Sequence, residues 1–213
     1  MTSGHVLELL SLPTMHPQCG DALLEQCALS LIVRLSIDPT RLAKGMMSRE
    51  VSVNWLATPD GVELCEERIV SWVGASAGRE DALVQWPVGV SSQRQTEDAA
   101  IAVTALLLHN LACAEIVKVL RIGSGGDYLV QLAGDAGLAQ AESSGIRSDP
   151  TGSESKSVLN KKKAQVLKKC DSGFASVTTF LHTKSVSVHS YLHQVRRAVG
   201  GDQPKKIKKA RRR

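Results

Sequence analysis

The stretch GGDYLVQLAGDAGLAQAESSGI, residues 125–146, decides the fold that we predict for this chain. Two β-prone segments flank a glycine-containing turn, which is typical of a β-hairpin. The predicted parts are a strand at 127–132, a tight turn at 133–137 and a returning strand at 138–146. The first strand begins at Asp127, and the second contains Glu142. Directly opposed Cβ atoms in a hairpin lie about 5 Å apart, and diagonal neighbours lie about 7 to 8 Å apart. We therefore expect Asp127 to lie close to residues 142–144.

The segments around the hairpin complete a mixed α/β pattern. The sequence predicts a buried helix at 96–116 and a strand at 116–122 before the hairpin. After it, a basic amphipathic helix is predicted at 154–169 and a strand at 174–181. The order from residue 96 is thus helix, strand, strand, strand, helix, strand. The last patterned segment, 185–197, is compatible with a strand or a helix.

The first ninety residues are predicted to form an α+β segment. Their apolar spacing predicts a helix at 20–37, and alternation predicts a strand at 48–57. Residues 58–75 indicate a turn followed by an amphipathic helix.

Composition indicates a cytoplasmic protein with an aliphatic core. Aromatic residues make up only 3% of the 213 residues, so Leu, Val, Ile and Ala must form the core. Few aromatic rings also disfavour recognition of single-stranded nucleic acid by stacking. The five cysteines are scattered, with no CxxC pair, which fits a reducing compartment. We see no signal-peptide pattern and no apolar run of membrane-spanning length, and we expect no membrane association.

The positive charge of the chain is concentrated at its C-terminus. Without the tail KKIKKARRR, residues 205–213, the formal net charge falls from +5 to −2. Such a tail attracts nucleic-acid phosphates without reading sequence, although a solvated terminus without a partner has the same composition. The residues that we predict to contact phosphates are Lys205, Lys206, Lys208, Lys209, Arg211, Arg212 and Arg213.

The hairpin carboxylates suggest a metal site. Asp127 and Glu142 would repel each other unless a cation lay between them. Mg²⁺ prefers oxygen ligands and is often held by one or two carboxylates plus water. A metal there could polarise a phosphodiester and lower the pKa of an attacking water. The alternatives are an aspartate that ends a turn and a glutamate exposed on an edge strand.

This order of elements, with Asp127 on the second strand and Glu142 on the third, resembles the restriction-endonuclease-like superfamily, named for its PD-(D/E)xK motif. The resemblance covers residues 92–182. It implies a nuclease in which the two motif carboxylates hold Mg²⁺. In the family a glutamate of the first helix often joins the metal site, and Glu97 matches that position.

The chain departs from the family's motif at Ser144. The family has a lysine there, two residues after the glutamate, and a serine hydroxyl cannot supply its positive charge. Some family members carry this lysine on the following helix, where the chain offers Lys162 and Lys163, and we assign the role to Lys163. The resemblance implies nucleic-acid contacts for the other lysines of that helix, with a solvated helix face as the alternative. These lysines are Lys161, Lys162 and Lys168.

We therefore predict an α/β protein with a restriction-endonuclease-like core (α-β-β-β-α-β) and an N-terminal α+β segment. The predicted parts are the N-terminal segment (1–90), a nuclease-like domain (91–197) and a basic flexible tail (198–213). The predicted function is a nucleic-acid-associated, Mg²⁺-dependent phosphodiesterase, with DNA favoured over RNA. Asp127 and Glu142 would hold the metal, and Glu97 and Lys163 would assist. Two alternatives remain open: an inactive nuclease-like scaffold that binds other protein subunits, and a structural subunit of a nucleoprotein particle in which the motif is accidental.

Overall fold

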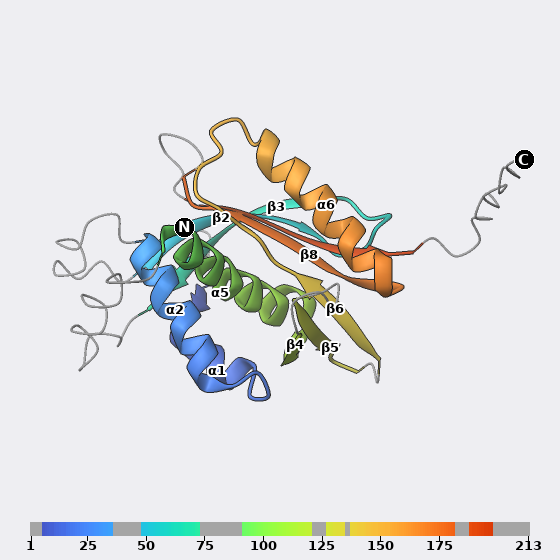
Figure 1. The fold of residues 1–213 in the computed structure, drawn as a ribbon, viewed down its shortest axis with the longest axis horizontal. Helices are drawn as coiled ribbons and strands as arrows, with labels where there is room; N and C mark the ends of the chain where they lie inside the picture. The colour runs from blue at the N-terminus through green and yellow to red at the C-terminus, as the bar shows by residue number, and fades with distance from the viewer. Residues whose placement is uncertain are drawn as a thin grey trace, which may run out of the picture.

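The described residues of the chain form one mixed β-sheet with helices on both of its faces (Figure 1). The fold is seen in a computed structural model, which describes residues 6–35, 48–72, 91–120, 127–134, 137–181 and 188–197. Its strands are β1 (Val6–Glu8), β2 (Ser48–Leu56), β3 (Leu64–Ser71), β4 (Ala114–Val119), β5 (Tyr128–Leu132), β6 (Leu138–Glu142), β7 (Gly145–Ile146), β8 (Ser172–Thr179) and β9 (His189–Arg196). Its helices are η1 (Leu9–Ser11), α1 (Leu12–Met15), α2 (Asp21–Leu35), α5 (Ser92–Ala112) and α6 (Ser153–Lys169). The predicted α/β class is confirmed.

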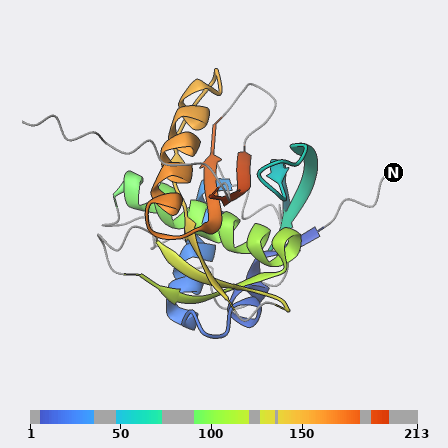
Figure 2. The same cartoon turned by 90° about the vertical axis from the view of Figure 1, so that its right-hand side faces the viewer.

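The nine strands have the order β1-β3-β2-β9-β8-β6-β5-β4, with β7 beside β8. Helices α2 and α5 pack on one face, and α6 packs on the other, as Figures 1 and 2 show. The larger core lies under α2 and α5 and is mainly aliphatic, as the low aromatic content predicts. A smaller cluster around Leu159, Val177 and Tyr191 seats α6 on the sheet. None of the helices in the described part of the chain has the length and apolar character needed to cross a membrane.

Helix α5 crosses the sheet as the central buried helix. The hydroxyl of Ser91 accepts a hydrogen bond from the Arg94 N–H and caps the first turn. The helix ends at Ala112 because Cys113 adopts a left-handed backbone conformation, with φ of 47°. The helix predicted at 96–116 is therefore present but begins and ends four residues earlier, and the chain enters β4 directly after the cap.

The predicted order of helix and strands from residue 92 onward is confirmed, except that the returning strand predicted at 138–146 is divided into β6 and β7. Strands β4, β5 and β6 form an antiparallel meander, and α6 then carries the chain across to β8, which is parallel to β6. The carboxylate of Asp149 fixes the start of α6 by accepting hydrogen bonds from the N–H and hydroxyl of Ser155, both at 2.7 Å. Burial raises the pKa of Asp149, but the bonds from Ser155 and its neighbours lower it more, to about 2.

The N-terminal residues belong to the same sheet. Strand β2 lies parallel to β9 and antiparallel to β3, so it extends the sheet beyond the predicted nuclease-like region. The amphipathic helix predicted within 58–75 is wrong, because residues 64–71 form β3 between β1 and β2. Pairing on both sides outweighs a local pattern that also suits a helix. The ambiguous segment 185–197 contains strand β9.

Candidate active site

The hairpin brings Asp127 next to the end of β6. The pairing of Tyr128 with Ala141 sets the register, and the Asp127 N–H donates to the Ala141 carbonyl oxygen at 3.1 Å. The Asp127 Oδ2 atom accepts a hydrogen bond from the Ser143 N–H at 2.9 Å. The expectation that Asp127 lies close to residues 142–144 is therefore confirmed.

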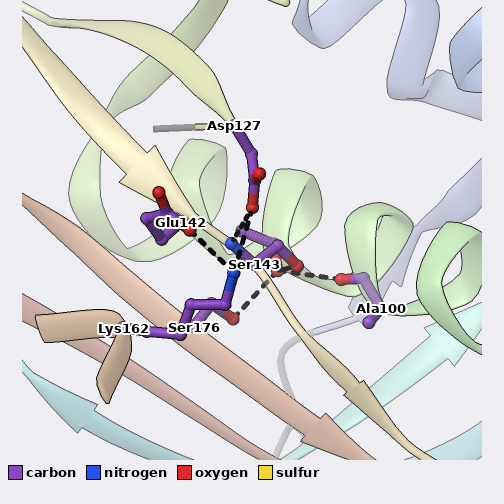
Figure 3. Close-up of polar contacts among 7 residues, drawn as sticks. Ala100, Asp127, Glu142, Ser143, Lys162 and Ser176 are labelled. Carbon is purple, nitrogen blue, oxygen red and sulfur yellow. Dashed lines mark hydrogen bonds and ion pairs between the residues drawn. The ribbon is translucent and has the colours of Figure 1, made fainter. Parts of the chain in front are cut away.

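Lys162 reaches both carboxylates from helix α6 (Figure 3). Its Nζ atom lies 2.7 Å from Glu142 Oε2 and 3.5 Å from Asp127 Oδ2. The Glu142 side chain is only 4% exposed, whereas that of Asp127 is 42% exposed. One carboxylate is thus held in the protein interior by a charged hydrogen bond, and the other opens toward solvent.

The three charged groups do not cancel. Two ionised carboxylates and one ammonium leave one negative charge in excess. Burial raises the pKa of Glu142, the hydrogen bond from Lys162 lowers it, and repulsion by Asp127 raises it, with a net upward shift. The site therefore favours either a further cation or a proton on Glu142.

Asp127 and Lys162 border a pocket of about 240 Å³ on the surface of the protein. Glu97 also lines this pocket, from the first turns of α5, and accepts a hydrogen bond from the Gln93 side-chain amide at 3.3 Å. The complete lining is Glu97, Ile101, Asp127, Tyr128, Ser143, Ser144 and Lys162. The structure thus brings Glu97 to the same pocket as Asp127. Glu142 is connected to this pocket through its ion pair with Lys162.

Lys163, to which we assigned the role of the missing lysine, is not in this pocket. It lines a different pocket over β9. Consecutive residues of an α-helix point about 100° apart, so α6 directs Lys162 toward β6 and its neighbour toward β9. Lys162 occupies the position beside the carboxylates instead. It was predicted as a phosphate contact, and its ammonium is already engaged by Glu142.

Ser144 lies where the family's motif has lysine. Its backbone N–H donates to Ser176 O, and its carbonyl accepts from the Thr178 N–H, so the residue is held against β8. Its side chain lines the pocket but carries no charge. Lys162 therefore provides the only ammonium among the described residues that line the pocket.

A buried hydroxyl cluster supports the site from the α5 side. The Thr104 Oγ1 atom lies 2.9 Å from the hydroxyls of Ser143 and Ser176 and 2.8 Å from the Ala100 carbonyl oxygen (Figure 3). This cluster ties the backbone that binds Asp127 to helix α5. Sequence reasoning missed it, because a threonine inside an apolar helix gives no sign of the strand that it will face.

The other predicted nucleic-acid contacts are separate from this pocket. Lys161 and Lys168 are exposed, seven residues apart on the solvent side of α6. The tail residues at 205–213 lie outside the described residues.

Carboxylate oxygens are the protein ligands that Mg²⁺ prefers. Asp127 supplies one carboxylate in the wall of the pocket, and Glu142 supplies a second, buried one that is joined to the pocket through Lys162. Over the described ranges, no group of three or more histidine, cysteine, aspartate or glutamate side chains is placed to hold a metal ion. A metal at this site would therefore depend on few protein ligands plus water.

Comparisons with known proteins do not identify the chain: no family model matches it, and no curated protein or solved structure is significantly similar to it. The resemblance to the PD-(D/E)xK superfamily consequently depends on the residues and geometry described above.

Proposed function

We propose that the protein is a cytoplasmic, nucleic-acid-associated phosphodiesterase of restriction-endonuclease-like type, with Mg²⁺ as its cofactor. The observation that carries the proposal is the meeting of the Asp127 and Glu142 carboxylates at the Lys162 ammonium, beside a pocket that Asp127 and Lys162 line. Two carboxylates and a cation are the parts that the PD-(D/E)xK motif combines.

Each residue has a role that its environment supports. Asp127 and Glu142 would hold the metal, which when bound would polarise the scissile phosphate and activate a water. The Lys162 ammonium, 2.7 Å from Glu142, would offset negative charge that develops on the phosphate. Glu97, which also lines the pocket, would take a proton or orient water.

Lys162 would supply the positive charge that the motif lacks at Ser144. A lysine on α6 can serve the site because α6 follows β6 and β7 in the chain and packs against both β6 and β8. The motif lysine would thus have moved from strand to helix while its charge remained beside the glutamate. Backbone phosphates would be held by Lys161, Lys168 and the basic tail through contacts that weaken with salt, and DNA is the favoured substrate.

One observation favours a second candidate, an inactive nuclease-like scaffold that binds other proteins. The Lys162 ammonium already forms a close ion pair with the buried Glu142 carboxylate. If the ion pair is permanent, the site stabilises the fold and does no chemistry.

The deciding experiment is cleavage of mixed DNA and RNA substrates with Mg²⁺ or Mn²⁺, together with calorimetric metal binding. We expect Asp127→Asn and Glu142→Gln to abolish cleavage and metal binding. Lys162→Met should lower the cleavage rate by about 10² to 10³ while metal binding persists. Glu115→Gln is the matched control, because Glu115 is an exposed acid on β4. Absence of cleavage and of metal binding in folded wild-type protein would instead refute the phosphodiesterase proposal and leave the non-enzymatic alternatives.

A further inference from the structure

A second pocket lies on the α6 side of the sheet, over β2 and β9. Its volume is about 340 Å³, and it shares no lining residue with the carboxylate pocket. Strands β2 and β9 are parallel neighbours, so residues far apart in the sequence share its floor. Its polar lining includes Asn54, Glu63, Lys156, Lys163 and His193.

His193 is buried in this pocket with its hydrogen-bonding capacity unused. Its side chain is 4% exposed, and neither ring nitrogen has a hydrogen-bond partner among the described residues. The nearest acid, Glu63, has its Oε2 atom 3.6 Å from Nε2, which is too far for a hydrogen bond. Buried polar groups without partners are rare in native proteins and are costly, so this ring indicates a missing partner.

Lysines from α6 give the pocket a positive charge. Lys156 and Lys163 are seven residues apart, which places them on one side of the helix about two turns from each other. Neither forms an ion pair within 4.0 Å with any described residue. Burial lowers the pKa of Lys163, and the opposing effect of Glu63 is smaller. Burial, and then the charge of Lys163, lower the pKa of His193 to about 4, so its ring is neutral at physiological pH.

The pocket therefore holds two ammonium groups and one carboxylate, with a net charge of one positive, and an imidazole N–H without an acceptor. Asn54 is already engaged, because its amide nitrogen lies 2.5 Å from His189 Nε2. The unused donors come from α6 and from β9, on two sides of the cavity. A group with several acceptor oxygens and negative charge matches donors that converge from two directions.

We propose that this second pocket binds the phosphate group of a phosphate ester, with Lys163, Lys156 and the His193 N–H as its donors. A free phosphate monoester and a nucleic-acid backbone offer the same chemistry here. Glu63, whose carboxylate also lines the pocket, would accept a hydrogen bond from a hydroxyl of the ester. The proposal does not depend on catalysis at Asp127 and Glu142.

The test is calorimetric titration of the full chain with inorganic phosphate, adenosine 5′-monophosphate and a short DNA duplex, while NMR follows the His193 ring signals. The variants are Lys163→Gln and, because it is more exposed, Lys156→Gln. Lys118→Gln is the charge-matched control, since Lys118 is an exposed lysine on β4 outside both pockets.

We expect saturable phosphate binding that shifts the His193 signals and weakens at least tenfold in both pocket variants but not in the control. Competition between the duplex and inorganic phosphate would assign the site to a nucleic-acid backbone, and tighter binding of the mononucleotide alone would assign it to a free ester. Three results would overturn the proposal: no saturable binding of any probe, equal weakening in Lys118→Gln, or His193 signals that do not move because water alone fills the pocket.

Discussion

Replacing Lys162 by methionine tests the electrostatics of the carboxylate site through stability. The substitution keeps the length and apolar stem of the side chain but removes the ammonium that lies 2.7 Å from Glu142. Glu142 is then left almost fully buried, beside Asp127 and without a cation. Its pKa, which burial already raises, must rise further.

The magnitude follows from proton linkage. When the pKa of a carboxyl group is higher in the folded state than in the unfolded state, the protein loses stability as pH rises from the unfolded-state pKa to the folded-state pKa. The slope is about 1.4 kcal/mol per pH unit. Glu142 begins from an ordinary value of 4.5. At pH 7, Glu142 therefore makes Lys162→Met less stable than the wild type by at most about 3.4 kcal/mol. The upward pKa shift already present in the wild type makes this deficit smaller. As pH falls below the ordinary value of 4.5, Glu142 takes up a proton in both proteins and in their unfolded states, and the deficit becomes small.

Urea unfolding of wild type and variant from pH 4.5 to 8, at constant ionic strength, measures this difference. We expect the deficit to grow with pH in Lys162→Met and to lose most of its pH dependence when Glu142→Gln is added. Lys161→Met, on the exposed side of α6, should change stability by less than about 0.5 kcal/mol at every pH. A deficit that stays constant with pH, or that survives unchanged in the double variant, would refute the assignment of a buried, lysine-stabilised carboxylate.

Three further substitutions test the fold around the site, each by chemical unfolding. His16→Phe should cost roughly 2–4 kcal/mol, since the buried ring of His16 lies 3.0 Å both from a backbone oxygen of α5 and from a backbone N–H of β4. Burial lowers the pKa of His16, so the wild type should also lose stability as pH drops below 6.5. His16→Phe should lack this pH-dependent loss. Gly145→Ala should cost at least about 2 kcal/mol, because a Cβ atom there would lie 2.3 Å from the Thr96 carbonyl oxygen, and a stable variant would contradict the close packing of β7 on α5. Asp149→Ala should cost about 1–2 kcal/mol at neutral pH, and this deficit should disappear as pH falls from 3.8 through 2, where the wild-type carboxylate takes up its proton.

The local part of the candidate site was predictable because a hairpin is a short-range structure. Once the turn near residue 134 is placed, the pairing of β5 with β6 follows, and Asp127 must lie near the end of β6. Helices α5 and α6 were predictable for a similar reason, since their apolar spacing extends over several turns.

Which lysine completes the site was not predictable from the sequence. Periodicity shows that Lys162 and Lys163 point in different directions, but not which of them faces β6. That choice depends on how α6 is rotated on the sheet, which the packing of Leu159 against Val177 and Tyr191 sets.

The second pocket is a tertiary feature throughout. It requires β2 to pair with β9, a contact between Asn54 and His189 that spans 135 residues. Pairing with β1 and β2 explains why residues 64–71 form a strand where the local pattern favours a helix.

The sequence by itself determined helices α2, α5 and α6, the hairpin and the approach of two carboxylates, because each depends on neighbours within one or two elements. Only the tertiary structure decided the rotation of α6 on the sheet and the order of the strands. It also decided which side chains join Lys162 at the carboxylate site and which join Lys163 in the second pocket. Those features depend on hydrophobic burial against distant strands, and the local spacing of apolar residues does not show which strands these are.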